Sequence, residues 1–119
     1  MKKTLVIGAS AKPDRYAYKA TVMLREYNHE VYPFGLKEGV IEKNKIETTW
    51  PVDTAFDTVT LYLNKQNQKE YIDKIIALKP KRVIFNPGTE NAAFEAQLQQ
   101  AGIEALQACT LVLLSTGQY

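Results

Sequence analysis

The chain has 119 residues, of which 45% are hydrophobic and 24% are charged, a composition ordinary for a globular domain. We expect residues 1–119 to form a single domain with a modest core. The formal net charge is only +2 and no basic run is interleaved with aromatic residues, which argues against a nucleic-acid or membrane-surface partner. One cysteine, Cys109, excludes an internal disulfide framework and is typical of a reducing compartment.

The amino-terminal sequence "MKKTLVIGASA" superficially resembles a secretory signal. Its apolar run is shorter than the ~7 residues that such a signal needs. No stretch approaches the ~20 apolar residues of a membrane span. We therefore predict a cytoplasmic protein.

The first strand and the first helix are clear in the sequence. Residues Leu5 to Ile7 form an apolar run that ends at Gly8, as in a parallel strand buried on both faces. A helical stripe follows, with Asn28 suited to the left-handed position after the helix. The predicted stripe consists of Tyr16, Ala20, Met23, Leu24 and Tyr27.

The middle of the chain predicts two further strands. Residues 30–35 read as a short second strand that Pro33 and Gly35 end, and residues 58–64 are β-branched and aromatic, as in a third strand. Residues 36–56 show no clean period. We expect them to be mostly irregular and to cover one face of the sheet.

The second half alternates helix and strand. A capping-box pattern from Asn67 to Glu70 predicts a helix that ends at Pro80. A fourth strand over residues 82–86, a helix ending at Gly102 and a fifth strand over residues 103–107 follow. The alternation predicts an α/β, Rossmann-like three-layer fold with a five-stranded parallel sheet in the order 3-2-1-4-5.

Ligands of such folds bind beyond the carboxyl ends of the strands, where the strand order reverses. This rule brings together four strand exits, at residues 8–15, 33–37, 64–65 and 86–91. In the first exit, Gly8 permits a tight turn, Ser10 offers a hydroxyl, and Lys12 and Arg15 add positive charge. Lys37 adds charge at the second exit. A plain strand-to-helix turn with solvated charges remains the alternative.

The first exit does not match a dinucleotide fingerprint. Pro13 stands where the third glycine is expected, and the acidic residue expected at the end of the second strand is missing. Pro33, Phe34 and Gly35 occupy that strand end instead. These departures argue against NAD.

Five short motifs in order resemble the CoA-binding domain family, which is similar to the CoA-binding domain of succinyl-CoA synthetase alpha subunits. They are "VIGAS" (6–10), "VYP" (31–33), "LNK" (63–65), "NPGTEN" (86–91) and Cys109. The resemblance covers nearly the whole chain and implies a Rossmann-like fold with a pocket for CoA or an acyl-CoA. In two places the chain departs from the family, with Gly35-Leu36 where Asn-Pro is common and Lys65 where arginine is common.

The resemblance also implies roles for individual residues. The phosphate turn would be lined by Gly8, Ala9 and Ser10, with Arg15 approaching the pyrophosphate. Pro33 would bound the adenosine side. The remaining residues beside the ligand would be Asn64, Lys65, Pro87, Gly88 and Asn91.

Three other features have competing interpretations. His29 lies before the second strand, away from the predicted pocket, and is expected at the surface. Cys109 follows the fifth strand and is either a small buried hydrophobe or a thiol close to that of CoA, where a mixed disulfide could form. The apolar tail, residues 109–119, either docks on the sheet edge or forms a homodimer contact.

These observations favour a non-catalytic module that binds CoA or an acyl-CoA. No acid/base pair and no metal-ligand pattern is recognisable in the sequence. The alternatives are an NAD(P)-dependent oxidoreductase or other nucleotide-binding enzyme, and an assembly protein with a vestigial pocket.

Overall fold

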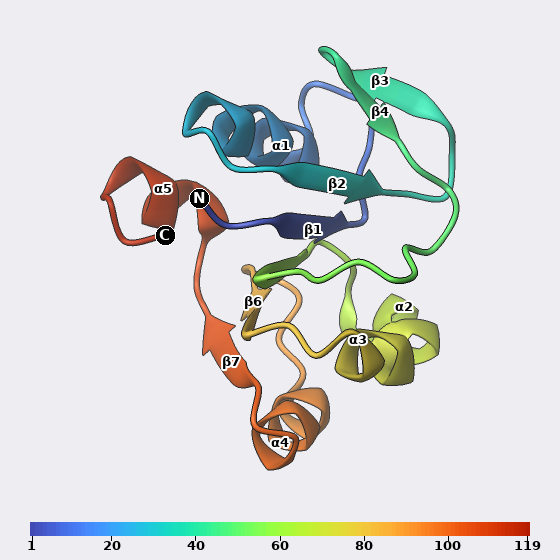
Figure 1. Ribbon diagram of the computed structural model, residues 1–119, viewed down its shortest axis with the longest axis vertical. Helices are drawn as coiled ribbons and strands as arrows, with labels where there is room; N and C mark the ends of the chain where they lie inside the picture. Colours follow the sequence, from blue (N-terminus) through green and yellow to red (C-terminus); the bar gives the residue numbers. More distant parts are fainter.

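The computed structural model describes residues 1–119 and contains a five-stranded parallel sheet with helices on both faces (Figure 1). The sheet strands are β1 (Thr4–Ile7), β2 (Val31–Phe34), β5 (Thr58–Leu61), β6 (Arg82–Phe85) and β7 (Glu104–Gln107). Each ladder between them is parallel. The predicted α/β, Rossmann-like class is confirmed.

The strands stand in the order β2-β1-β5-β6-β7, so the third parallel strand lies beside the first and not beyond the second. The segment predicted as irregular explains this placement, because it holds an antiparallel hairpin of β3 (Gly39–Ile41) and β4 (Asn44–Ile46). Glu47, the first residue after β4, forms a parallel bridge with the end of β2. Glu47 N donates to Pro33 O at 2.8 Å, and Gly35 N donates to Glu47 O at 3.0 Å. With that edge occupied, β5 pairs with β1, and the strand order reverses between these two strands.

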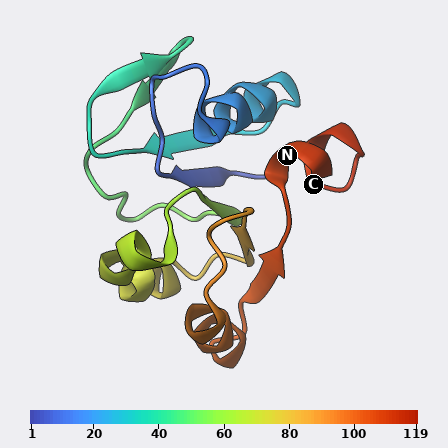
Figure 2. The same ribbon diagram turned by 180° about the vertical axis from the view of Figure 1, so that it is seen from behind.

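One face of the sheet is covered by α1 (Tyr16–Glu26) and α5 (Thr110–Ser115), which Figure 2 shows from the other side. The core there consists of Val6, Ala17, Leu24 and Leu114. The predicted stripe of α1 is rotated, because Tyr16 is 66% exposed whereas Ala17 is buried. Three of the four buried residues of α1 are small, namely Ala17, Ala20 and Thr21. Asn28 adopts the predicted left-handed conformation, with φ 68°.

The tail forms α5 on this face of the sheet and not along its edge. Leu114 is buried against Val6 of β1 and Leu24 of α1. Val112, on the outer side of α5, is 53% exposed. The homodimer contact stays a prediction.

The opposite face is covered by α2 (Lys65–Gln68), the 3₁₀ helix η1 (Lys69–Tyr71), α3 (Ile72–Leu78) and α4 (Ala92–Gln100). The helical segment begins three residues before the predicted start, because β5 ends at Leu61 and leaves Asn64 free to act as N-cap. Asn64 Oδ1 accepts from Asn67 N at 2.9 Å. Gly102, with φ 79°, follows α4 as predicted.

The main core lies on this second face. Its buried members are Leu5, Ile7, Phe34, Phe56, Val59, Leu61, Tyr71, Ile75, Val83, Phe85, Phe94, Leu98 and Ile103. Phe56 belongs to the segment predicted to cover a sheet face, and Trp50 from the same segment packs against the cluster. None of the helices combines the length and apolar character needed to cross a bilayer.

Candidate functional site

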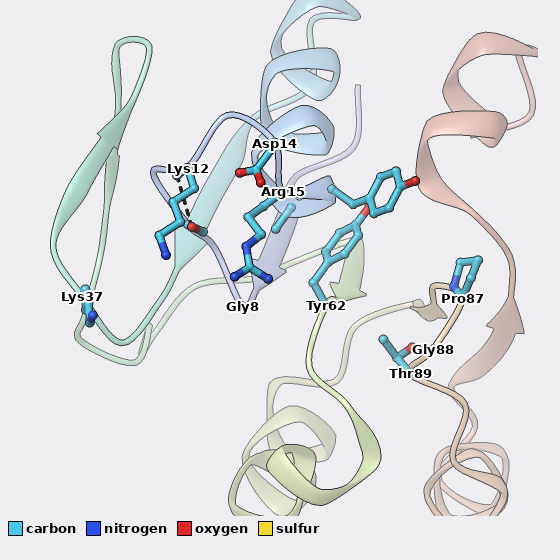
Figure 3. A pocket seen from close by; sticks show the side chains of 12 residues that line it. Gly8, Lys12, Asp14, Arg15, Lys37, Tyr62, Pro87, Gly88 and Thr89 are labelled. Carbon is cyan, nitrogen blue, oxygen red and sulfur yellow. Dashed lines mark hydrogen bonds between the residues drawn. The ribbon is translucent and has the colours of Figure 1, made fainter.

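An open cavity of ≈ 660 Å³, hereafter the polar cavity, lies where the strand order reverses between β1 and β5 (Figure 3). Its walls come from the loops after β1, β2, β5 and β6 and from the first turn of α1. The lining residues are Gly8, Ser10, Lys12, Asp14, Arg15, Tyr16, Ala17, Lys37, Tyr62, Pro87, Gly88 and Thr89.

The loop after β1 is held close to two neighbouring strands. Gly8 has φ +95°, and a Cβ there would lie 3.0 Å from Tyr62 O, so the position requires glycine. The amides of Gly8 and Ala9 both donate to Phe34 O, at 3.0 and 2.9 Å. These two amides are therefore engaged within the protein, and they fix the loop to the end of β2.

The first turn of α1 opens into the polar cavity. Arg15 is the N-cap residue and its side chain makes no capping hydrogen bond. Tyr16 and Ala17, the first two residues of the helix, line the cavity. The amides of a first helical turn have no partner within the helix and attract anions. This end of α1 is thus suited to bind a phosphate group.

Positive charge predominates around the polar cavity. Lys12 and Arg15 come from the loop after β1 and Lys37 from the loop after β2, while Asp14 is the single carboxylate in the lining. All three cationic residues are exposed. The two ion pairs of the structure involve other residues. The three cations are therefore unpaired and available to an anionic ligand.

A buried polar network joins the loops after β5 and β6. The Gln68 side chain donates through Nε2 to Leu63 O at 2.9 Å and to Thr89 O at 2.7 Å. Asn91 Nδ2 donates to Gln68 Oε1 at 3.0 Å, and Asn91 Oδ1 accepts from Phe94 N at 3.2 Å. The network fixes Thr89, and with it one wall of the polar cavity.

The structure brings together seven of the twelve residues predicted for the site. They are Gly8, Ser10, Lys12, Arg15, Lys37, Pro87 and Gly88.

The other five predicted residues do not line the polar cavity. Pro33 is buried within β2 opposite Val6, and Ala9 is bonded to the end of that strand. Asn64 is a helix cap and Asn91 is engaged with Gln68. Lys65 is exposed in the first turn of α2.

Sequence reasoning missed five lining residues, Asp14, Tyr16, Ala17, Tyr62 and Thr89. Tyr16 and Tyr62 are predicted only as part of the core and pocket wall and not as ligand-site residues, because Tyr16 falls on the apolar helix stripe and Tyr62 within the third predicted strand. Their position at element ends beside the strand exits is the signal that could have identified them.

A second cavity, hereafter the apolar cavity, has a volume of ≈ 220 Å³ and adjoins the first. It is lined by Tyr16, Tyr62, Asn86, Pro87, Cys109 and Leu111. Cys109 is a free, half-buried cysteine, so it is neither fully buried nor remote from the carboxyl ends of the strands.

His29 lies outside both cavities, just before β2. It was expected at the surface but is half-buried. Its Nδ1 accepts a hydrogen bond from Lys2 N at 2.9 Å. Its ring also lies 4.9 Å from that of Tyr119.

Solved structures share this arrangement of the chain. A crystal structure of an uncharacterized protein is 50% identical, with a TM-score of 0.97 over 100% of this chain and 98% of that chain. A hypothetical protein from Pyrococcus horikoshii OT3 is 25% identical, with a TM-score of 0.87 over 97% of this chain and 82% of that chain. A comparison with curated proteins finds no match.

A dinucleotide-forming acetyl-coenzyme A synthetase 1 from Ca. Korarchaeum cryptofilum, solved with phosphate and ADP, has the same fold. It is 17% identical, with a TM-score of 0.69 over 88% of this chain and 25% of that chain. Among protein families, the model of the CoA binding domain family matches residues 2–115. The match spans nearly the whole chain and agrees with the observed fold, and the protein therefore belongs to the CoA binding domain family.

Proposed function

We propose that the protein binds coenzyme A or an acyl-CoA in the polar cavity, as a small non-catalytic module. The observation that carries the proposal is the set of three unpaired cations, Lys12, Arg15 and Lys37, around a cavity at the strand reversal. Membership of the CoA binding domain family supports it. The cavity volume of ≈ 660 Å³ also falls within the ~300–1,000 Å³ typical of small-molecule sites.

In this proposal the phosphates of CoA lie between the first turn of α1 and the three cations. The Arg15 guanidinium is planar and donates two parallel hydrogen bonds to a phosphate, while Lys12 and Lys37 act as point charges. The Ser10 hydroxyl is free to donate, because it accepts from Lys12 N at 3.2 Å.

NAD and NADP are the alternative ligands. The lining carboxylate, Asp14, comes from the loop after β1, whereas ribose-diol recognition in NAD-binding folds uses an acidic residue at the end of the second strand. CoA does not require that carboxylate. This difference favours CoA over NAD.

Calorimetric titration of the protein with CoA, acetyl-CoA, NAD and NADP tests the proposal. We expect CoA and acetyl-CoA to bind, and CoA at about 100 times its Kd to raise the free energy of unfolding by ~2.7 kcal/mol. Binding of NAD without binding of CoA would contradict the proposal. If none of the four ligands binds, the alternative of an assembly protein with a vestigial pocket is favoured.

The Arg15→Ala variant tests the phosphate contact. A hydrogen bond to a charged group contributes about 1.5–3 kcal/mol, so the Kd for CoA is expected to rise by roughly tenfold to a hundredfold. Lys43→Ala, an exposed position in the turn between β3 and β4, is the matched control with an unchanged Kd. Circular dichroism of both variants should match that of the wild type. An unchanged Kd in Arg15→Ala would remove Arg15 from the site.

A further inference from the structure

The apolar cavity adjoins the polar cavity and shares three walls with it, Tyr16, Tyr62 and Pro87. Both open where the loops after β5 and β6 leave the carboxyl ends of the strands. Figure 3 shows Tyr62 between the loop that carries Arg15 and the loop that carries Pro87. A ligand held by its phosphates in the polar cavity therefore has a second compartment directly beside it.

The chemistry of the apolar cavity differs from that of its neighbour, because no charged residue lines it. The Asn86 amide is already engaged, with Nδ2 donating to Thr60 Oγ1 and Leu61 O and Oδ1 accepting from Thr110 N. The Tyr62 hydroxyl is buried and has no hydrogen-bond partner. Burial raises the pKa of this hydroxyl, so it stays neutral.

These features set what the apolar cavity accepts. An apolar group would break no hydrogen bond there, because the Asn86 amide is already engaged within the protein. The Tyr62 hydroxyl, which has no partner, is itself buried. A carboxylate would lose its hydration without gaining a cationic partner. The cavity is therefore suited to a small, uncharged, aliphatic group.

Resting on the proposed function, we propose that the apolar cavity is the subsite for the acyl group of an acyl-CoA. It selects short aliphatic acyl groups over the free thiol, and over acyl groups that end in a carboxylate. Each buried methylene strengthens binding by about fourfold. Because the cavity has a volume of only ≈ 220 Å³, the additional methylenes of a long acyl chain do not fit inside it and add no affinity.

The inference is tested by titrating the protein with CoA and with acetyl-, butyryl-, octanoyl- and succinyl-CoA, with a thiol reductant present. We expect butyryl-CoA to bind more tightly than acetyl-CoA, and acetyl-CoA more tightly than CoA. Octanoyl-CoA should gain nothing over butyryl-CoA, and succinyl-CoA should bind no more tightly than CoA. Equal affinities for all ligands, or tightest binding of succinyl-CoA, would overturn the subsite while leaving CoA binding intact. Failure of every ligand to bind would overturn the proposed function itself.

Leu111 lines the apolar cavity but not the polar cavity, so substituting it tests the acyl subsite separately from the phosphate site. Leu111→Trp should fill the compartment and abolish the advantage of butyryl-CoA, while the Kd for CoA stays within about twofold. Val112→Trp, on the exposed side of the same helix, is the matched control that keeps the acyl preference.

Leu111→Ala enlarges the apolar cavity and serves where the tryptophan variant does not fold. It should shift the preference toward octanoyl-CoA. An unchanged order of affinities in Leu111→Ala would place the acyl group elsewhere.

Discussion

Asn86 is the residue that joins three elements beneath the cavities. Its Nδ2 donates to Thr60 Oγ1 at 2.6 Å and to Leu61 O at 2.8 Å, both on β5. Its Oδ1 accepts from Thr110 N at 2.9 Å, at the start of α5. Asn86 itself follows β6 and is 2% exposed. One amide side chain thus connects β5, β6 and α5.

We predict that Asn86→Ala destabilises the fold by on the order of 3 kcal/mol, because buried partners lose their hydrogen bonds at about 1–3 kcal/mol each. Urea unfolding measures the change. Asn67→Ala, an exposed asparagine, is the control and should change the free energy of unfolding by less than about 0.5 kcal/mol. Equal effects of the two substitutions would show that the buried amide contributes no special stability.

At the scale of elements, the end of β2 supports the loop that carries the polar cavity. A Cβ at Gly35 would lie 2.5 Å from Ala9 O and 3.1 Å from Ile46 Cγ2. Such contacts require the backbone to move. The loop after β1 and the β3–β4 hairpin therefore pack around Gly35, and the position of one depends on the other.

Gly35→Ala is predicted to cost about 1–3 kcal/mol of stability by overpacking, and also to weaken CoA binding because the loop after β1 must shift. Gly102→Ala is the control. A Cβ added at Gly102 would meet no atom within 4 Å, but the residue has φ +79°. Gly102 follows α4 and lies far from the loop after β1. It should lower stability by about 1 kcal/mol without changing the Kd. Loss of affinity in both variants would indicate a general effect of stability, contrary to this prediction.

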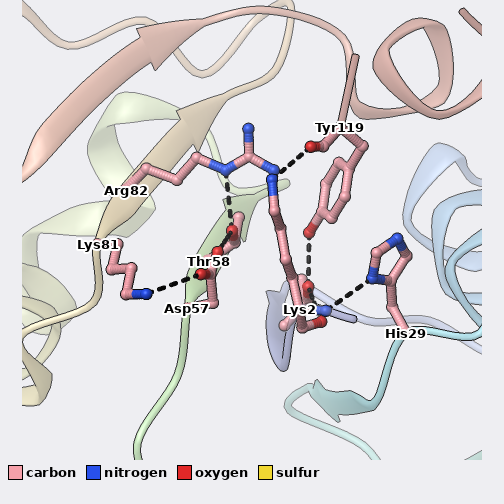
Figure 4. Close-up of polar contacts among 8 residues, drawn as sticks. Lys2, His29, Asp57, Thr58, Lys81, Arg82 and Tyr119 are labelled. Atoms are coloured by element: carbon pink, nitrogen blue, oxygen red, sulfur yellow. Dashed lines mark hydrogen bonds and ion pairs between the residues drawn. The ribbon is translucent and has the colours of Figure 1, made fainter. Parts of the chain in front are cut away.

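At the scale of the whole molecule, the two chain ends lie side by side at the amino ends of the strands (Figure 4). Lys2 N donates to His29 Nδ1 at 2.9 Å, and the Tyr119 hydroxyl bonds to Thr4 Oγ1. The Arg82 guanidinium lies 4.4 Å from the centre of the Tyr119 ring. This cluster connects β1, β2 and β6 with the carboxyl-terminal tail.

Burial, followed by the positive charges of the amino terminus, Lys2 and Arg82, lowers the pKa of His29 below its ordinary value of 6.5. The unfolded chain therefore takes up a proton before the folded protein does, and stability falls as the pH decreases below ~6.5. Thermal unfolding between pH ~8 and ~5 measures this dependence. Since His29 is the single histidine, His29→Gln should flatten the curve in that range. An identical pH profile in the variant would exclude His29 as the cause.

Much of the fold was predictable because its signals are local. The apolar run before Gly8, the left-handed Asn28 and Gly102, and the alternation of strand and helix all depend on neighbouring residues. The helix start at Asn64 was not predicted, because two asparagines three residues apart compete for the N-cap and the length of β5 decides between them. The hairpin of β3 and β4 was missed because its strands are only three residues long.

The sequence by itself determined the α/β class, the family resemblance, and a basic, glycine-containing loop after the first strand. The tertiary structure decided which strand lies beside β1, which residues face the polar cavity, and that an apolar cavity adjoins it. These features depend on contacts between residues distant in the sequence, such as Glu47 with Pro33 and Gln68 with Thr89. Periodicity reports which face of an element is apolar, but the packing of one element on another sets which side chains meet.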